Sequence, residues 1–163
     1  MLADTISKIN RKSPTILVVG DLMLDRFIFG TVERISPEAP VPIVKLKKEK
    51  QMLGGCGNVI RNLDNLGIKT LLCSVVGQDL AGDLLIDQLK EKDIPISNIL
   101  RSHNIRTTEK MRIVADRQQV VRVDWDMNDL KIGFSNDLIK NIAEQIQDID
   151  GLIISDYAKG VCS

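Results

Sequence analysis

The chain has 163 residues, of which 44% are hydrophobic and 27% charged, the profile of a globular protein rather than a disordered or fibrous one. Its 22 lysine and arginine residues balance 22 aspartate and glutamate residues, so no overall positive field attracts nucleic acid or anionic lipid. Aromatic residues make up only 3%, which leaves little capacity for base stacking. We therefore expect a small-molecule or protein partner, and neither nucleic acid nor membrane.

The length suits one domain, and no glycine-serine or proline-rich linker divides the chain, so we treat residues 1–163 as one unit. The segment Met1–Ser13 contains no continuous apolar run and therefore predicts neither a signal peptide nor a membrane anchor. The three cysteines, Cys56, Cys73 and Cys162, form no C-x-x-C pair, which suits a reducing compartment. These features predict a cytoplasmic protein.

Short apolar runs rich in β-branched residues alternate with segments of helical spacing. The runs predict buried strands of a parallel sheet, and the spaced segments predict amphipathic helices. Strands are expected at Thr15–Asp21, Thr70–Val76 and Leu152–Asp156, and helices at Cys56–Leu66, Leu80–Leu89 and Leu138–Ile146. Gly67 stands where a helix C-cap favours glycine, and Ser135 is the expected N-cap of the last helix. The order predicts an α/β fold with a doubly wound, mostly parallel sheet.

Two segments break this rhythm because they alternate apolar with polar side chains, as half-exposed strands do. They are Val41–Lys47 and Arg106–Trp125, the second with an expected turn at Asp116–Gln118. We expect Met111 and Ile113 to share one face of this second segment, and Val121, Val123 and Trp125 to share another. The pattern predicts a small β-sheet lid, with strands near residues 27–47 and 106–125, that can cover a ligand.

Carboxylates stand at the ends of two expected strands, Asp21 after the first and Asp156 after the last, with Asp25 just beyond Asp21. Ligands of open parallel sheets gather beyond the carboxyl ends of the strands, and carboxylates accept hydrogen bonds from sugar hydroxyls. Asp21 and Asp156 are equally placed to cap the next helix or turn. The pattern alone leaves both roles open.

The stretch Gly54-Gly55-Cys56-Gly57-Asn58 precedes an expected helix. Its glycines permit a ligand to approach the backbone N–H groups closely, and Asn58 adds an amide with donors and an acceptor. The spacing is neither the dinucleotide fingerprint nor the P-loop. A tight turn that enters a helix explains the same residues equally well.

Cations gather in the alternating segment, where Lys110 and Arg112 have the even spacing that places side chains on one side of a strand, with Arg122 close in sequence. Cations on adjacent strands can converge on a phosphate. A solvated strand face is the alternative.

Three ordered stretches resemble a known family. They are Gly20–Arg26 (GDLMLDR), Arg34–Pro42 (RISPEAPVP) and Leu53–Val59 (LGGCGNV), followed by Thr107–Arg112, Arg122–Asp124 and Ser155–Gly160. From about Pro14 onward the chain resembles the heptose-7-phosphate kinase branch of the ribokinase-like (PfkB-type) carbohydrate kinases. The I-S-P-E-A-P-V-P run is the specific part of the resemblance, whereas G-G-x-x-N is shared by many sugar kinases.

The resemblance implies transfer of the ATP γ-phosphoryl group to the anomeric hydroxyl of D-glycero-β-D-manno-heptose 7-phosphate, a step of ADP-heptose and lipopolysaccharide core synthesis. Residues that match the family's sugar-hydroxyl positions are Asp25, Gly54, Gly55 and Asn58, with Asp21 and Asp156 as neighbouring candidates. We infer that Lys110, Arg112 and Arg122 face the 7-phosphate. The resemblance also implies a homodimer formed through the lid.

One departure concerns catalysis. The family's D-T-x-G-A-G-D element, which carries the catalytic aspartate, does not occur in this sequence. We expect the catalytic aspartate to lie beyond Ser163, the last residue of the chain, and the ATP-binding loops to belong to the same later part of the domain. We therefore assign no catalytic residue and no metal ligand here.

The chain thus resembles the N-terminal half of a kinase domain. ATP and Mg²⁺ are expected to be bound by the complete domain, and the isolated chain is expected to be inactive. The alternatives are a non-catalytic sugar-phosphate-binding module, or one half of a split kinase.

Overall fold

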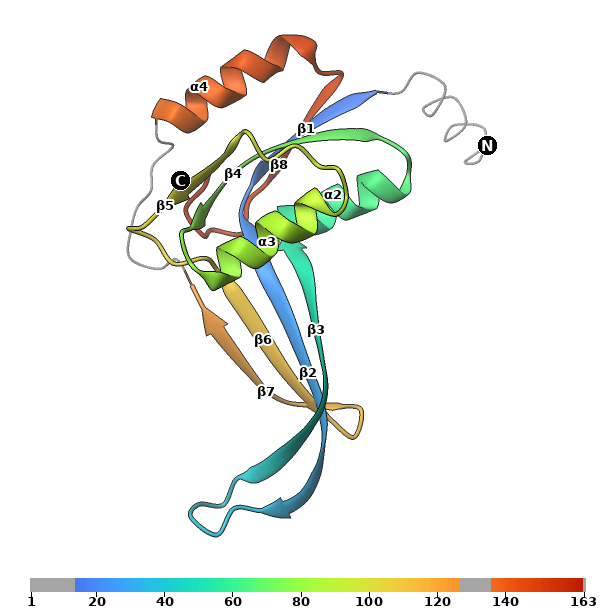
Figure 1. The fold of residues 1–163 in the computed structure, drawn as a ribbon, viewed down its shortest axis with the longest axis vertical. Helices are drawn as coiled ribbons and strands as arrows, with labels where there is room; N and C mark the ends of the chain where they lie inside the picture. The colour runs from blue at the N-terminus through green and yellow to red at the C-terminus, as the bar shows by residue number, and fades with distance from the viewer. Residues whose placement is uncertain (1–13, 127–135, 163) are drawn as a thin grey trace.

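The computed structural model describes residues 14–126 and 136–162. Within these ranges an α/β layer carries a long β-sheet that projects from it (Figure 1). The strands are β1 (Thr15–Gly20), β2 (Leu22–Ile35), β3 (Pro42–Gly55), β4 (Lys69–Gly77), β5 (Ile99–Ser102), β6 (Glu109–Ala115), β7 (Gln118–Trp125) and β8 (Gly151–Ser155). The helices are α2 (Cys56–Asn65), α3 (Leu80–Lys90) and α4 (Asn136–Gln145), followed by the 3-10 turn η1 (Ile146–Asp148).

The α/β layer is built on a parallel sheet in which the described strands have the order β5-β4-β1-β8. Successive side chains of β1 point to opposite faces: Val18 packs with α2 and α3, whereas Leu17 and Val19 pack with Leu138 and Ile142 of α4. Both faces are therefore covered by helices, which explains why β1 is an unbroken apolar run. The predicted α/β, doubly wound architecture is confirmed.

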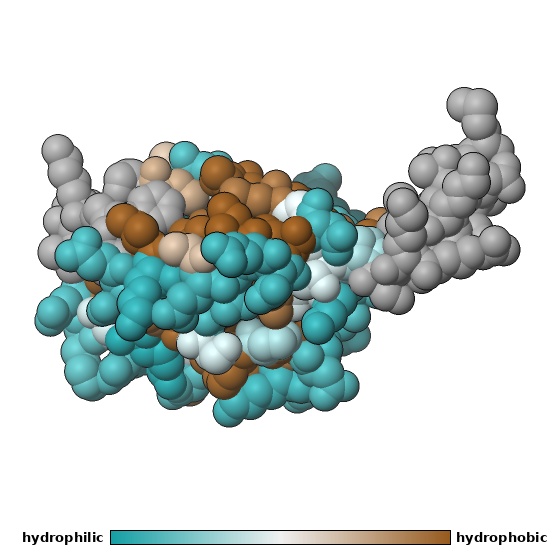
Figure 2. All heavy atoms as spheres, turned by 90° about the horizontal axis from the view of Figure 1, so that it is seen from above, coloured by the Kyte–Doolittle hydropathy of each residue, from teal (hydrophilic) through white to brown (hydrophobic). Residues whose placement is uncertain are grey.

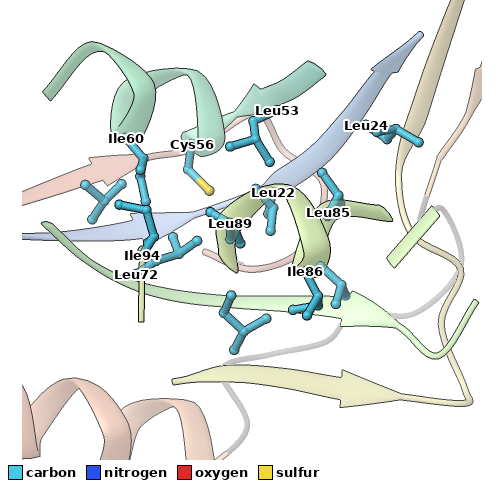
Figure 3. Close-up of a cluster of buried hydrophobic side chains, with 13 residues drawn as sticks. Leu22, Leu24, Leu53, Cys56, Ile60, Leu72, Leu85, Ile86, Leu89 and Ile94 are labelled. Carbon is cyan, nitrogen blue, oxygen red and sulfur yellow. The ribbon is translucent and has the colours of Figure 1, made fainter. Parts of the chain in front are cut away.

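The larger hydrophobic cluster lies where α2 and α3 pack on this sheet. Figure 3 shows Cys56 and Ile60 of α2 and Leu85 and Leu89 of α3 gathered around Leu22, and all five side chains are fully buried. Burial of one such leucine or isoleucine stabilises the fold by about 1.5–3 kcal/mol. Because Leu22 is the first residue of β2, the projecting strand is anchored in the core of the α/β layer.

The projecting sheet, which we call the lid, has the order β3-β2-β6-β7. β2 is antiparallel to β3 and parallel to β6, and β6 is antiparallel to β7. The sheet contains both regions where the sequence predicts half-exposed strands, but β2 and β3 run on into the α/β layer. The expected turn is confirmed: Asp116 and Arg117 have φ of 51° and 69°, as a two-residue hairpin loop of type I′ requires.

The predicted faces of β6 and β7 need one correction. Ile113 lies opposite Val121 and Met111 lies opposite Val123, so the two apolar sets share one face of the lid rather than two. The two-residue turn causes this, because it fixes a register in which cross-strand partners project to the same side. We call this surface, formed by Met111, Ile113, Val121 and Val123, the apolar face.

The remaining expected elements lie close to their predicted places, including helix α2, whose end is followed by Gly67 at φ 70°. Strand β5 was not predicted.

No helix in the described ranges is long and apolar enough to cross a membrane. Seen from the end that carries α4, hydrophobic and hydrophilic side chains gather in separate areas (Figure 2).

Three of the sequence predictions concern residues that the structure does not describe. The helix N-cap at Ser135 and the leading segment Met1–Ser13 lie outside the described residues. Ser163, beyond which we expect the catalytic aspartate, also lies outside them. These three predictions therefore stay predictions.

Candidate functional site

A cavity of about 250 Å³ opens where the lid meets the N-terminal half of helix α2. Residues from β2, β3, α2, β6 and the segment after β8 line it: Met23, Asp25, Met52, Leu53, Gly55, Asn58, Arg61, Lys110, Arg112 and Tyr157. Five of the residues predicted from the sequence are in this lining, namely Asp25, Gly55, Asn58, Lys110 and Arg112. The fold thus brings together side chains that are far apart in the sequence.

The two glycines that precede α2 leave room for neighbouring groups, a side chain at Gly54 and the backbone at Gly55. A Cβ atom on Gly54 would lie within 2.4 Å of Asp25 Oδ2, and one on Gly55 would lie within 2.2 Å of the Asp21 carbonyl oxygen. Gly55 also has φ of 58°, a conformation that favours glycine. Gly54 thus leaves room for the Asp25 carboxylate at the cavity wall, and the close approach of a ligand to these glycines stays a prediction.

Asp25 is held by a lid cation. Arg112 Nη1 donates a hydrogen bond of 2.5 Å to Asp25 Oδ1, and the two side chains are 24% and 20% exposed. The Arg112 guanidinium also lies 5.1 Å from the centre of the Phe27 ring. Arg112 thus orients the carboxylate, whose free lone pairs can accept hydrogen bonds from hydroxyl groups.

The α2 side of the cavity carries a cation that the sequence reasoning missed. Arg61 Nη2 donates a hydrogen bond of 2.6 Å to Asn58 Oδ1, and Arg61 Nη1 lies 3.6 Å from the Met52 sulfur. The sequence could have indicated Arg61, because it follows the predicted site residue Asn58 by three positions, and residues three apart on a helix lie on the same face.

Tyr157 was also missed as a site residue. It follows β8, and its ring lies 5.7 Å from Lys110 Nζ of the lid. The motif Ser155–Gly160 includes it, but the prediction took only Asp156 from that motif. Lys110 and Tyr157 therefore form one contact between the lid and the α/β layer.

The charge of the cavity is positive. Its described lining contains three cations, Arg61, Lys110 and Arg112, and one carboxylate, Asp25, so the formal excess is two positive charges. A phosphomonoester carries about −1.5 to −2 at pH 7. The cavity is matched in charge to such a group, with acceptors for hydroxyls beside it.

Asp21, the residue before β2, is fully buried and is not among the described residues that line the cavity. Its carboxylate accepts hydrogen bonds from the backbone N–H groups of Tyr157 (2.7 Å), Lys159 (3.2 Å) and Val161 (3.1 Å). Asp156 is exposed and accepts a hydrogen bond from the Ala158 N–H at 2.7 Å. These contacts correspond to the turn-stabilising role that the sequence left open, and a role in sugar binding stays a prediction for both residues.

Arg122 is not among the described residues that line the cavity. It lies on β7, and its Nε donates a hydrogen bond of 2.9 Å to Asp124. Its predicted contact with a phosphate therefore has less support than those of Lys110 and Arg112.

The cysteines near the site are unsuited to nucleophilic chemistry. Burial raises the pKa of Cys56, which contacts the Gly20 carbonyl oxygen at 3.4 Å, far above that of a free thiol. Burial likewise raises the pKa of Cys73 and of Cys162 to about 11. At neutral pH these thiols are protonated and hence weak nucleophiles.

A second cavity, of about 390 Å³, lies on the opposite side of the lid, against the start of α3. Its lining includes Met111 and Trp125 of the lid and Leu84 of α3, and Arg106 lies 5.1 Å from the Trp125 ring centre. Asp79, also in the lining, caps α3.

Comparison with known proteins identifies the family. Residues 13–162 match the pfkB family of carbohydrate kinases. The chain belongs to the pfkB carbohydrate kinase family. Among curated members, it is 50% identical over 147 residues to the bifunctional protein HldE of Helicobacter pylori strain J99, covering 90% of this chain and 32% of that protein. It is 42% identical over 151 residues to the bifunctional protein HldE of Aliarcobacter butzleri, covering 92% and 32%.

Solved structures of sugar kinases share this fold. A carbohydrate kinase from Agrobacterium tumefaciens superposes with a TM-score of 0.67 at 22% identity, over 86% of this chain and 45% of that one. The Arabidopsis thaliana ribokinase complexed with ribose and ATP gives a TM-score of 0.63 at 15% identity, over 86% and 45%. The resemblance read from the sequence is confirmed at the level of the pfkB kinases. The chain spans about a third of the length of the curated relatives.

Carbohydrate kinases of this family generally use ATP and Mg²⁺. In residues 14–126 and 136–162, no group of three or more histidine, cysteine, aspartate or glutamate side chains is arranged to hold a metal ion. ATP and Mg²⁺ therefore stay an expectation for the complete domain.

Proposed function

We propose that this chain binds the sugar-phosphate substrate of a heptose-7-phosphate kinase. In the complete domain, the ATP γ-phosphoryl group is transferred to the anomeric hydroxyl of D-glycero-β-D-manno-heptose 7-phosphate, within ADP-heptose and lipopolysaccharide core synthesis. The observation that carries the proposal is the cavity with a formal excess of two positive charges beside a carboxylate and an amide. The HldE relatives at up to 50% identity support the heptose assignment.

The cavity residues divide into two chemical roles. Asp25 and Asn58 accept or donate hydrogen bonds to sugar hydroxyls, and the Gly55 backbone lies beside them. Lys110 and Arg112 provide charge-assisted hydrogen bonds to the phosphate. Gly54 contributes by its lack of a side chain, which makes room for Asp25.

The chain's part in the reaction is to bind and orient the sugar. Phosphoryl transfer depends on positioning and on stabilisation of the charge that develops on the phosphoryl group, and on a base that accepts the hydroxyl proton. The D-T-x-G-A-G-D element that carries the family's catalytic aspartate is not in this sequence. We therefore propose that the isolated chain does not turn over ATP, and that the later half of the domain, as a partner, supplies the ATP and Mg²⁺ sites.

We also propose a cytoplasmic homodimer formed through the apolar face of the lid. Val121 and Val123 on that face are 44% and 36% exposed. Apolar side chains adjacent to one another on a sheet favour contact with a partner surface. The exposed valines are the support for this assembly.

A non-catalytic sugar-phosphate-binding module, or one half of a split kinase, is the alternative function. Both use the same cavity and differ in whether a second polypeptide restores transfer. Mixing the chain with the later part of a pfkB kinase domain separates them, because phosphoryl transfer by the mixture favours the split kinase.

The test is calorimetric titration of the chain with D-glycero-β-D-manno-heptose 7-phosphate, in parallel with ribose and fructose 6-phosphate. The expected result is selective binding of the heptose phosphate. Equal binding of fructose 6-phosphate would contradict the heptose assignment but retain a sugar-phosphate site. Binding of ribose alone would contradict the role of the cations.

A further inference from the structure

The cations in and near the cavity differ in what they contact. Arg112 is paired with Asp25 inside the cavity, and Arg122 is paired with Asp124 outside its lining. Among the described lining residues, Arg61 and Lys110 are the cations whose contacts are to uncharged groups: an amide oxygen and a thioether sulfur for Arg61, an aromatic ring for Lys110. Their charges are therefore not neutralised by a carboxylate in direct contact.

Arg61 retains the means to bind an anion. A guanidinium has five N–H donors, and the contacts to Asn58 and Met52 use two of them. The planar fork of the group matches the oxygens of a phosphate, to which it can donate two parallel hydrogen bonds. We propose that Arg61 binds the phosphate of the substrate and determines the preference of the site for phosphorylated sugars. This inference rests on the proposed function.

The position of Arg61 supports this role. It follows Ile60, whose side chain is fully buried in the core, so α2 holds it on the α/β layer, whereas Lys110 lies on the lid. A phosphate in the cavity is therefore within the reach of one cation from each layer. The contact between Arg61 and Asn58 also places the phosphate beside the hydroxyl-binding residues, as a short sugar phosphate requires.

The test compares two ligands, D-glycero-D-manno-heptose 7-phosphate and the same heptose without phosphate, by calorimetry. For the unmodified chain the ratio of the two affinities measures selectivity for the phosphate. Arg61→Gln is expected to lower that ratio by about 10-fold or more, because a charge-assisted hydrogen bond is lost. Arg61→Lys keeps the charge without the fork and is expected to give a smaller decrease. Arg34→Gln, the matched control on an exposed part of β2 outside the described cavity lining, is expected to leave the ratio unchanged.

The ratio of the affinities for heptose 7-phosphate and for unphosphorylated heptose distinguishes phosphate binding by Arg61 from a purely structural role. If Arg61 only oriented Asn58, Arg61→Gln would weaken both ligands equally and the ratio would stay constant, which would overturn the proposal. A decrease with Arg34→Gln but not with Arg61→Gln or Arg61→Lys would overturn it too.

A comparison with fructose 6-phosphate tests the proposed function separately from the role of Arg61. If the unmodified chain prefers fructose 6-phosphate to heptose 7-phosphate, and Arg61→Gln abolishes its preference for fructose 6-phosphate over fructose, the heptose assignment fails while the role of Arg61 stands. If the unmodified chain shows no preference for any phosphorylated sugar, both fail.

Discussion

The two faces of the lid are built from alternate residues of the same strands, yet their chemistry differs. One face, which we call the ligand face, contributes Asp25, Lys110 and Arg112 to the small cavity. The apolar face carries Met111, Ile113, Val121 and Val123. Because side chains of a strand alternate between faces, one sheet can bind a charged ligand on one side and a hydrophobic surface on the other. We therefore expect that a substitution on one face can change ligand binding without changing self-association, and the reverse.

The largest expected effect comes from reversing a charge on the ligand face. Lys110→Glu removes one cation and adds one anion, so the formal excess of two positive charges in the cavity is lost. We expect the affinity for heptose 7-phosphate to fall by about 100-fold, on the order of 3 kcal/mol, in calorimetry at low salt. Self-association should not change, and a change in it would break the separation of the two faces.

A smaller effect is expected from a charge on the apolar face. Val121→Asp places a carboxylate where we propose a partner lid packs, and should raise the dissociation constant of the dimer by about 10- to 100-fold. Sedimentation equilibrium measures this change. Gln118→Asp, at the exposed end of the same strand, is the control. Heptose phosphate affinity should remain within about twofold, as expected for sites that share no contacts.

The smallest effect concerns Asp79, which joins the start of α3 to the segment that precedes β6. Its Oδ1 accepts from the Gly82 N–H at 2.8 Å, and its Oδ2 accepts from the Thr107 N–H at 2.8 Å. Burial alone would raise the pKa of Asp79, but these hydrogen bonds outweigh it and the pKa lies below its ordinary value. Loss of the cap in Asp79→Ala should lower the free energy of unfolding by about 1 kcal/mol at pH 7.

The pH dependence sharpens this prediction. Because the folded-state pKa of Asp79 is depressed, its contribution is present above the unfolded-state pKa of about 3.9 and is lost as the pH falls through the lower folded-state pKa. The difference between Asp79→Ala and the unmodified chain in urea unfolding should therefore shrink below about pH 4. Asp79→Asn, which keeps a capping oxygen without the charge, should lose less stability. A difference that grows at low pH would contradict the assignment.

Much of the fold could be predicted because its signals are local. The apolar run of β1 and the spacing of α2 each follow from burial on a sheet, and both elements lie where expected. The relation between β6 and β7 could not be predicted by counting alternate residues within each strand. It depends on the two-residue turn at Asp116 and Arg117, which sets how the strands pair.

The site shows the same division between local and long-range information. Asp25, Asn58 and Lys110 were predicted from motifs and spacing, and they line the cavity. Tyr157, whose ring lies near Lys110, donates its backbone N–H to the buried Asp21 carboxylate, a contact between residues 136 positions apart. Such long-range contacts are not visible in periodicity.

Strand β2 gives the molecule a mechanical property. It extends from Leu22, in the core, to Ile35, with two irregularities in its pairing with β3, and Figure 1 shows that β2 reaches the outer part of the lid. Asp25 follows Leu22 by three residues. One end of the strand is therefore fixed in the core, whereas its other end is exposed. A force on the exposed end is transmitted along the strand as a bending moment towards the buried end, close to the Asp25 carboxylate. What touches the outer end of the lid is therefore mechanically coupled to the cavity that contains Asp25.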